Sequence, residues 1–216
     1  MSWNKKRLNN ANLYLILDRQ VLSYSGLLKV LKPAVRLGVD IVQLRDKNGS
    51  AKDILDFCRH LQRIVAGKAL FIVNDRVDLA ILAGADGVHL GQEDIPYSQA
   101  RKLMGPGPVI GVSCQRLDQA KLAQSQGVDY IGFGSVFKTK TKPQRQPMNL
   151  ELLRNVVKIM KIPVFPIGGI SCDNLGRLTN LGVERAAVCR EILLAKDAGE
   201  TIRELKLKLY RGGPPG

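Results

Sequence analysis

The sequence has no run of the roughly 18 to 20 consecutive apolar residues that a membrane-spanning helix requires. Its first ten residues, MSWNKKRLNN, carry basic side chains without an apolar segment behind them, so a signal peptide is not expected. These absences favour a cytoplasmic protein over a membrane or exported one. The apolar fraction of 45% is still ample for a packed core in a chain of 216 residues.

Cysteine pairs and aromatic residues are also scarce. The cysteines at positions 58, 114, 172 and 189 form no C-x-x-C pair and have no histidine at ligand spacing, so they predict reduced, mostly buried thiols rather than disulfides or a metal centre. Aromatic residues make up 5% of the chain, which leaves few surfaces on which bases could stack. A net charge of +14 would attract an anionic substrate, an acidic partner or a polyanion, and nucleic acid is the secondary hypothesis.

Short β-rich runs alternate with longer segments whose apolar residues recur at helical spacing. The expected strands span residues 13–17, 41–44, 70–73, 87–90, 109–112, 130–133, 164–167 and 186–188. The expected helices span residues 25–37, 50–66, 76–83, 97–104, 117–126, 149–160 and 173–181, with a last one that ends near Tyr210. About eight βα units with continuous apolar strands predict a (β/α)8 TIM barrel rather than an open doubly wound sheet.

A short pattern, Gly-(Val or Ala)-(Asp or Glu), recurs before four of the strands, with its glycine at positions 38, 84, 127 and 182. A glycine directly after an apolar helical segment is typical of a helix C-terminus. No Pro/Ser-rich linker divides the chain, so we expect one domain over residues 13–210. Residues 1–12 are expected to form a disordered or helical basic extension, and residues 211–216 a flexible tail.

Polar residues cluster after the predicted strands, at the end where a TIM barrel carries its functional loops. The motif QLRDK, residues 43–47, follows the second strand. Because alternate strand residues share a face, Gln43, Arg45 and Lys47 are expected to point into a site and Leu44 outward. They would bind an anion there; the alternative is a solvent-exposed strand end with a salt bridge to Asp46.

Two acidic residues, Asp75 and Asp94, end strands that should be neighbours. Carboxylates of this kind, completed by water and substrate phosphate, are ligands that Mg²⁺ accepts. An aspartate just after a strand is also a common helix N-cap, and the sequence leaves both roles open. His89 lies within an apolar run and is interpreted as a structural histidine with satisfied hydrogen bonds.

A loop rich in threonine and lysine follows the strand at 130–133, and it contains Lys138, Thr139, Lys140, Thr141 and Lys142. Threonine hydroxyls donate to phosphate oxygens and lysines supply mobile charge, so this loop predicts an anion site, with a solvated basic loop as the alternative. The seventh and eighth strands are followed by Gly168-Gly169 and Cys189-Arg190, and the corresponding loops of TIM barrels often bind phosphate.

In this order the motifs resemble thiamine-phosphate synthase. The resemblance covers the chain from Leu13 to about Ile192, and its motifs are QLRDK at 43–47, ND at 74–75, DGVHLGQED at 86–94, GVS at 111–113, YIGFGSVFKTKTK at 130–142 and IGGI at 167–170. It implies a (β/α)8 transferase that joins hydroxymethylpyrimidine diphosphate to a thiazole phosphate (carboxylate), releases diphosphate and forms thiamine phosphate.

The resemblance also implies roles for individual residues. Asp75 and Asp94 would hold Mg²⁺. The pyrimidine diphosphate would be held by Gln43, Leu44, Arg45, Asp46, Lys47, Asn74, Ser113 and Lys142. The thiazole phosphate would be held by Thr139, Thr141, Gly169 and the backbone near Cys189 and Arg190. Lys140 is counted with the substrate-binding residues, although its charge, like that of Lys138, is expected to be mostly solvated. The family's chemistry is dissociative, and the residues expected to assist departure of diphosphate are Arg45, Lys47, Ser113 and Lys142.

The chain departs from the family pattern at Gln115, Ser135, Lys138, Pro166 and Arg190. Gln115 stands where the family usually has histidine, and glutamine cannot transfer protons at neutral pH. This argues against the related thiazole tautomerase, which uses that histidine as its acid and base. A non-catalytic barrel that binds a phosphorylated metabolite or RNA is the other alternative, and the sequence leaves open whether the protein is a homo-oligomer.

Overall fold

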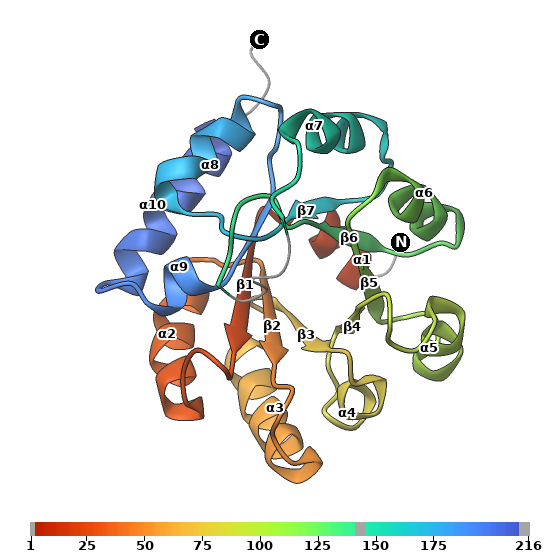
Figure 1. Ribbon diagram of the computed structural model, residues 1–216. Coiled ribbons are helices and arrows are strands. Elements are labelled where there is room, and N and C mark those ends of the chain that lie inside the picture. The colour runs from red at the N-terminus through yellow and green to blue at the C-terminus, as the bar shows by residue number, and fades with distance from the viewer. Residues whose placement is uncertain (1–2, 141–145, 212–216) are drawn as a thin grey trace.

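The computed structural model describes residues 3–140 and 146–211. Within these ranges eight parallel strands form one sheet in the order β7-β6-β5-β4-β3-β2-β1-β8. The strands are β1 (Leu13–Asp18), β2 (Ile41–Arg45), β3 (Leu70–Asn74), β4 (Gly87–Leu90), β5 (Val109–Cys114), β6 (Tyr130–Phe133), β7 (Val164–Pro166) and β8 (Ala186–Val188). A parallel bridge between Ile167 and Ala187 joins the two ends of this order, so the sheet closes into the predicted barrel (Figure 1).

Helices surround the strands and alternate with them along the chain (Figure 1). They are α1 (Trp3–Asn9), α2 (Tyr24–Arg36), α3 (Ala51–Val65), α4 (Val77–Leu82), α5 (Tyr97–Met104), α6 (Leu117–Ser125), α7 (Leu150–Ile159), α8 (Cys172–Thr179), α9 (Arg190–Leu193) and α10 (Ala198–Arg211). The short helix α9 was not expected from the sequence, and α10 continues one residue into the predicted tail. No helix within the described ranges is both long and apolar enough to cross a membrane.

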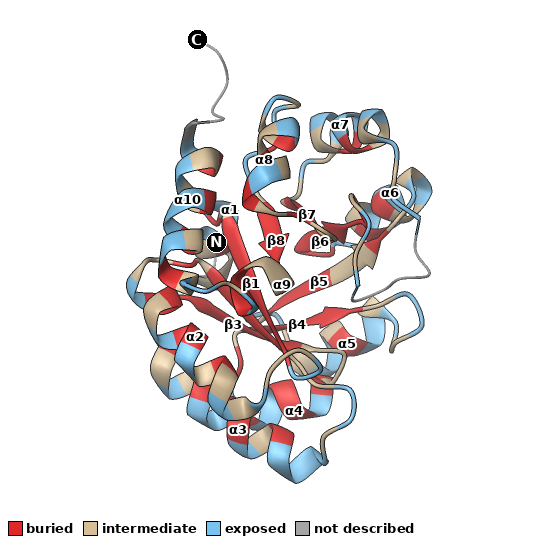
Figure 2. Ribbon diagram, turned by 60° about the vertical axis from the view of Figure 1, so that its left-hand side comes forward, coloured by how far each residue is buried: buried red, intermediate tan, exposed pale blue. Residues whose placement is uncertain are grey.

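Alternate strand residues fill two separate apolar layers. In β1, Tyr14 and Ile16 belong to the layer inside the barrel, whereas Leu13, Leu15 and Leu17 belong to the larger layer between the strands and the helices. The strands are therefore buried on both sides, and the helices expose one face each (Figure 2). This double burial explains why the strands are continuous apolar runs rather than alternating ones.

The four repeated glycines end helices, as the sequence predicts. Their φ angles are 74° at Gly38, 64° at Gly84, 87° at Gly127 and 81° at Gly182. These values lie in the left-handed region, which glycine adopts without the steric cost of a Cβ atom. The chain can therefore turn sharply from each helix into the strand that follows.

Aspartates of the same repeat tie the N-terminal ends of the strands together. The carboxylate of Asp40 accepts a hydrogen bond from the Leu13 backbone N–H at 2.9 Å, and that of Asp129 accepts one from the Ile110 N–H at 2.8 Å. The carboxylate of Asp86 likewise accepts a hydrogen bond from the Phe71 backbone N–H, near the start of β3, at 2.8 Å. Each contact joins the residue before one strand to the start of the preceding strand. The repeat therefore serves the fold, at the end of the barrel away from the predicted site.

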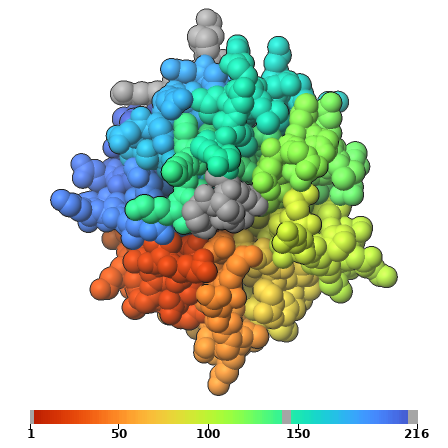
Figure 3. Space-filling view, in the orientation of Figure 1, coloured from red at the N-terminus to blue at the C-terminus, as the bar shows by residue number. Residues whose placement is uncertain are grey.

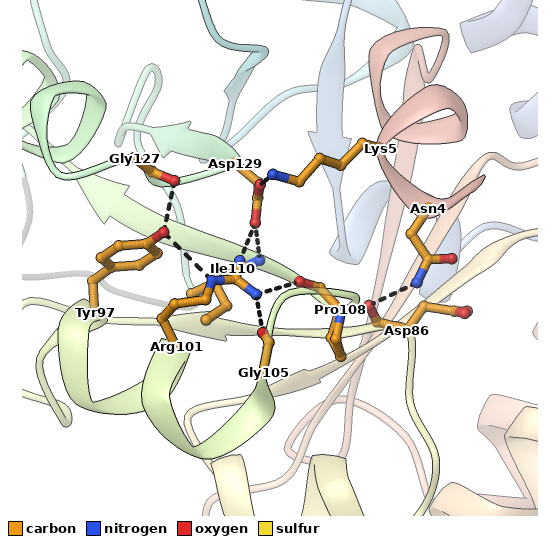
Figure 4. Close-up of polar contacts among 10 residues, drawn as sticks. All are labelled: Asn4, Lys5, Asp86, Tyr97, Arg101, Gly105, Pro108, Ile110, Gly127 and Asp129. Carbon is orange, nitrogen blue, oxygen red and sulfur yellow. Dashed lines mark hydrogen bonds and ion pairs between the residues drawn. The ribbon is translucent and has the colours of Figure 1, made fainter. Parts of the chain in front are cut away.

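The helix α1 packs against this same end of the barrel (Figure 4). Lys5 Nζ lies 2.8 Å from Asp129 Oδ1, and Asn4 Nδ2 lies 3.5 Å from the Asp86 carbonyl oxygen. Leu8 is 1% exposed and packs with the inner apolar layer. Residues 3–9 of the basic extension are thus a helix that covers the N-terminal end of the barrel.

The carboxylate of Asp129 also binds a second cation (Figure 4). Arg101 Nη2 donates to Asp129 Oδ2 at 2.5 Å, and Arg101 Nη1 donates to the carbonyl oxygens of Gly105 and Pro108, each at 2.7 Å. A buried carboxylate is stable only when charge and hydrogen bonds compensate its lost hydration. Lys5, Arg101 and the backbone together supply that compensation.

Candidate active site

A cavity of about 270 Å³ opens at the C-terminal ends of the strands. In the space-filling view, the segments of the chain follow one another round this face in sequence order (Figure 3). The predicted site residues that line the cavity are Gln43, Arg45, Asn74, Ser113, Thr139, Lys140, Gly169, Cys189 and Arg190, and Lys138 lines it as well. The predicted residues outside its lining are Leu44, Asp46, Lys47, Asp75 and Asp94. Thr141 and Lys142 lie outside the described residues.

One wall of the cavity carries a fixed arginine. Arg45 Nη1 donates to Asp18 Oδ2 at 2.9 Å and to Gln20 Oε1 at 3.1 Å. Asp18 is fully buried at the end of β1, which is paired with β2 in register. The ion pair of Arg45 is therefore with Asp18 and not with Asp46, and it holds the guanidinium at the cavity.

The residues on either side of Arg45, Leu44 and Asp46, do not line the cavity and make contacts that stabilise the fold. Leu44 is 1% exposed and packs in the outer layer, as its place in the strand predicts. Asp46 Oδ2 accepts from the Tyr24 hydroxyl at 2.7 Å, and Asp46 Oδ1 accepts from the Gly49 N–H at 2.8 Å. Burial raises the pKa of Asp46, but these hydrogen bonds outweigh it and hold the pKa below its ordinary value. Asp46 thus stabilises the turn after β2.

Two carboxylates face each other beside the cavity. Asp75, which follows the cavity residue Asn74, is close enough to hydrogen-bond with Asp94, and its pKa is raised by burial and then by this neighbour. Lys47 Nζ lies 3.1 Å from Asp75 Oδ2 and lowers that pKa in part. The strand β2 ends at Arg45, so Lys47 lies in the loop and contacts Asp75 instead of sharing the cavity wall with Gln43.

The loop at residues 134–140 rests on the glycine pair after β7. The backbone N–H groups of Val136 and Phe137 donate to the carbonyl oxygens of Ile167 and Gly168, each at 2.9 Å. Gly168 and Gly169 have φ angles of 104° and 65°, and a Cβ atom on either would collide with this loop. The glycine pair is needed because it lets the two loops meet at the cavity.

Two cysteines, Cys114 and Cys189, line the cavity, and neither is a thiolate, since burial raises the pKa of Cys114 as well as that of Cys189. Burial raises the pKa of Cys189 to about 12, so its thiol stays protonated at neutral pH. Cys189 is instead the residue before α9, whose first residue, Arg190, also lines the cavity. Among the described residues the four cysteines are all free thiols, in agreement with the sequence prediction.

A family model described as thiamine monophosphate synthase matches residues 13–192. The chain belongs to this family. A thiamine-phosphate synthase of Clostridium acetobutylicum is 39% identical, over 88% of this chain and 91% of that protein. A solved thiamine phosphate pyrophosphorylase from Pyrococcus furiosus is 34% identical and has a TM-score of 0.84 over 96% of this chain and 98% of that one.

Some relatives of this thiamine monophosphate synthase family member are longer. A thiamine-phosphate synthase of Gloeobacter violaceus is 43% identical over 96% of this chain but only 60% of that protein, and one of a Synechococcus strain is 42% identical over 58% of its length. The chain thus spans about three-fifths of these relatives. A solved 3-hexulose-6-phosphate synthase, at 16% identity and a TM-score of 0.68, shares the fold alone.

The carboxylate pair of this family member fits a divalent cation. Neither aspartate caps a helix, because α4 begins after Arg76 without a side-chain cap and α5 begins after Pro96. Two facing carboxylates with a raised pKa on Asp75 are the arrangement that a cation would relieve. No cluster of three or more His, Cys, Asp or Glu residues occurs in the described ranges, so water and phosphate would have to complete the coordination.

Two cavity residues, Asp18 and Tyr14, and their neighbour Tyr130 were not predicted as site residues from the sequence. Asp18 ends an apolar strand, the same signal that identified Asp75, but it lay outside the resembling motifs. Tyr14 and Tyr130 are fully or almost fully buried inside the barrel, where their hydroxyls lie 2.9 Å apart. Nothing in local spacing pairs two tyrosines so far apart in the chain. His89 is buried and hydrogen-bonded, as predicted, but it also lines the cavity.

Two of the residues that depart from the family pattern, Gln115 and Ser135, differ in their position relative to the cavity. Gln115 does not line the cavity, and its backbone N–H donates to Gln119 Oε1 at 2.8 Å. Ser135 does line it, and its hydroxyl donates to the Phe137 carbonyl oxygen at 3.1 Å. Ser135 therefore forms a hydrogen bond within the loop that carries Thr139, whereas Gln115 forms one with the first turn of α6.

Proposed function

We propose that the protein joins hydroxymethylpyrimidine diphosphate to a thiazole phosphate, or its carboxylate, and forms thiamine phosphate and diphosphate. Membership of the thiamine monophosphate synthase family supports this activity. The observation that carries it is the facing pair Asp75 and Asp94, with Lys47 beside them and Arg45 on the adjoining cavity wall. Two carboxylates and two cations next to a cavity suit a diphosphate bound together with a divalent cation.

The diphosphate substrate is assigned to the β2 and β3 side of the cavity. Within the described residues, both side-chain hydrogen bonds of Arg45 use the same nitrogen, Nη1, which leaves the other guanidinium N–H groups for a phosphate oxygen. The Lys47 side chain is 48% exposed, so its ammonium group can move from Asp75 to a bound phosphate. Gln43, Asn74 and Ser113 add neutral polar groups deeper in the cavity.

The thiazole phosphate is assigned to the opposite side. Thr139 and Gly169 line the cavity there, together with Arg190. Hydroxyl, backbone N–H and guanidinium groups are all donors to phosphate oxygens. Thr141 and Lys142 belong to the same proposal by family resemblance, Thr141 with this phosphate and Lys142 with the leaving diphosphate.

The residues suit a dissociative reaction, in which diphosphate leaves before the thiazole nitrogen attacks. Neither cysteine of the cavity lining is a thiolate, because burial raises the pKa of both Cys114 and Cys189 to about 12. Arg45 and Lys47 would instead stabilise the charge that accumulates on the diphosphate. A Mg²⁺ ion held by Asp75 and Asp94 would supply further neutralisation of the same charge.

The test is formation of thiamine phosphate by pure protein with both substrates and Mg²⁺. Asp75→Asn should abolish product formation, because it weakens the site for the Mg²⁺ that would neutralise the leaving diphosphate. Arg45→Ala should lower kcat/KM by roughly 10²–10³-fold, because it removes a cation that would stabilise the same charge. Asp118→Asn is the matched control, since this aspartate is exposed and its ion pair is with Arg116 at the start of α6. Absence of product from the wild-type protein under these conditions would refute the proposal.

A further inference from the structure

Six polar side chains cross the interior of the barrel in one hydrogen-bonded chain. Its order is Asn74, Gln43, Tyr14, Tyr130, His89 and Ser113, and the successive distances are 2.8, 2.6, 2.9, 3.1 and 2.9 Å. These residues come from six different strands, and both ends of the chain line the cavity. The direction of the hydrogen bonds therefore decides which groups the cavity presents as donors and which as acceptors.

The direction follows from the single proton of each phenol. The Tyr14 hydroxyl donates to Gln43 Oε1, and Gln43 Nε2 donates to Asn74 Oδ1. Tyr14 has then used its proton, so at the contact between the two tyrosines Tyr130 must be the donor. Burial raises the pKa of both hydroxyls well above neutrality, so both keep that proton.

The tautomer of His89 follows from the hydrogen bond of Tyr130. The proton of Tyr130 is engaged by Tyr14, so the Tyr130 oxygen accepts from Nδ1–H of His89. A neutral imidazole with its proton on Nδ1 has an acceptor at Nε2. The Ser113 hydroxyl, 2.9 Å away, therefore donates to His89 Nε2 and keeps its lone pairs for a donor in the cavity.

We propose that Tyr14 and Tyr130 are positioning residues, which set the direction of this chain and so make Ser113 an acceptor toward the substrate. At the other end the same direction leaves the NH₂ group of Asn74 as a donor. A bound ligand would then need a hydrogen-bond donor near Ser113 and an acceptor near Asn74. The identity of that ligand rests on the proposed function, whereas the direction of the chain does not.

The wild-type protein alone gives the first test. Nitrogen NMR of protein labelled in histidine should show Nδ1 of His89 protonated and Nε2 unprotonated, in one tautomer, at neutral pH. The sequence contains one other histidine, the exposed His60 on α3, so His60→Gln assigns the signals. A predominant Nε2–H tautomer, or a doubly protonated ring, would overturn the proposal.

Two substitutions test whether the effect travels along the chain. In Tyr14→Phe, Tyr130 loses its acceptor and should turn its proton toward His89 Nδ1, which shifts the tautomer to Nε2–H although Tyr14 does not bond to His89. Tyr130→Phe removes the acceptor of His89 Nδ1–H itself, so it should also shift the imidazole to the Nε2–H tautomer. Tyr97→Phe is the matched control, because this hydroxyl donates to the Gly127 carbonyl oxygen at the other end of the barrel (Figure 4). An unchanged tautomer in Tyr14→Phe would overturn the proposal.

Kinetics of the same variants separate this inference from the proposed function. Both variants should lose about tenfold in kcat/KM, the equivalent of one hydrogen bond. The loss should appear in KM for the pyrimidine diphosphate, because the contact is made equally in the ground and transition states. If the tautomer shifts in both variants but the wild type forms no product, the proposed function is refuted and the direction of the hydrogen-bonded chain is supported. If both variants keep full activity and the tautomer does not change, the proposed function is supported and the role of the two tyrosines is refuted.

Discussion

Replacing Asp75 with asparagine should stabilise the metal-free protein while it removes activity. In the wild type this carboxylate faces Asp94, and burial together with that neighbour raises its pKa. Lys47 at 3.1 Å opposes the effect only in part. Asparagine has nearly the same shape and no charge, so the variant can keep a polar contact with Asp94, and it loses the repulsion by Asp94, the attraction by Lys47 and the cost of burying a charge.

The expected gain can be bounded from the geometry. At an effective dielectric constant of about 20, two charges about 4 Å apart interact by about 4 kcal/mol, so repulsion by Asp94 and attraction by Lys47 largely cancel. What remains is the cost of burying the Asp75 charge. We expect a gain of about 1 kcal/mol in the free energy of unfolding, which corresponds to roughly 2–4 °C in Tm for a protein of this size.

The backbone of Asp75 supplies a matched control. Its φ angle is 63°, in the left-handed region that asparagine and aspartate tolerate better than other side chains. Asp75→Ala also removes the charge, but alanine in this conformation costs roughly 1–2 kcal/mol. The alanine variant should therefore be less stable than the asparagine variant by about 1 kcal/mol.

The gain should depend on pH, and its sign follows from the raised pKa. Between the ordinary value and the raised one, the folded state binds more protons than the unfolded state, so wild-type stability falls as pH rises through that range. Asparagine does not titrate. The advantage of Asp75→Asn should be largest at neutral pH and disappear as pH falls below the ordinary range of an aspartate.

Urea unfolding in EDTA, from about pH 4 to pH 8, measures this difference directly. Added Mg²⁺ should then stabilise the wild type by mass action and leave the asparagine variant nearly unchanged, which reverses their order. The reasoning is refuted if the wild type is the more stable protein in EDTA at neutral pH. It is also refuted if the difference between the two proteins is the same at both ends of the pH range.

Two further predictions concern the fold around the site. Asp129→Ala should cost about 3 kcal/mol, because it leaves Arg101 and the Ile110 N–H without their buried acceptor; urea unfolding measures it, and a cost no greater than that of a surface change would contradict it. Gly168→Ala should cost about 2 kcal/mol and raise KM for the thiazole phosphate, because its Cβ would collide with Ser135. Gly182→Ala, also at positive φ but with open space around it, should cost only about 1 kcal/mol, and equal costs for the two would refute the steric argument.

The architecture was predictable because its signals are local. Each boundary that the sequence predicts for a strand or helix agrees with the structure to within two residues. Apolar strands, amphipathic helices and glycine stops each act over a few residues, and their repetition about eight times specifies the barrel. The pattern missed α9, which has only four residues, fewer than two helical turns, and it left open whether the segment that forms α1 is helical.

The site was predictable only where strand position decides the contact. Gln43 and Arg45 share the cavity wall because they lie two apart on one strand. The same alternation failed for Lys47, because the strand ends at Arg45 and alternation has no meaning beyond it. Asp18 was missed as the partner of Arg45, since that pairing depends on the register between β1 and β2.

The two ends of the barrel use the same side chain in opposite ways. At the N-terminal end, Asp129 receives Lys5, Arg101 and a backbone N–H, so its charge is compensated and stabilises the packing of α1 and α5. At the C-terminal end, Asp75 faces another carboxylate, and burial together with that neighbour raises its pKa, so its charge is only partly compensated. A like-charge pair persists in a folded protein at a cost to stability, and such costs concentrate where a ligand completes the charge balance. The difference in compensation, more than the identity of the residues, distinguishes the end that holds the fold from the end proposed to hold the diphosphate.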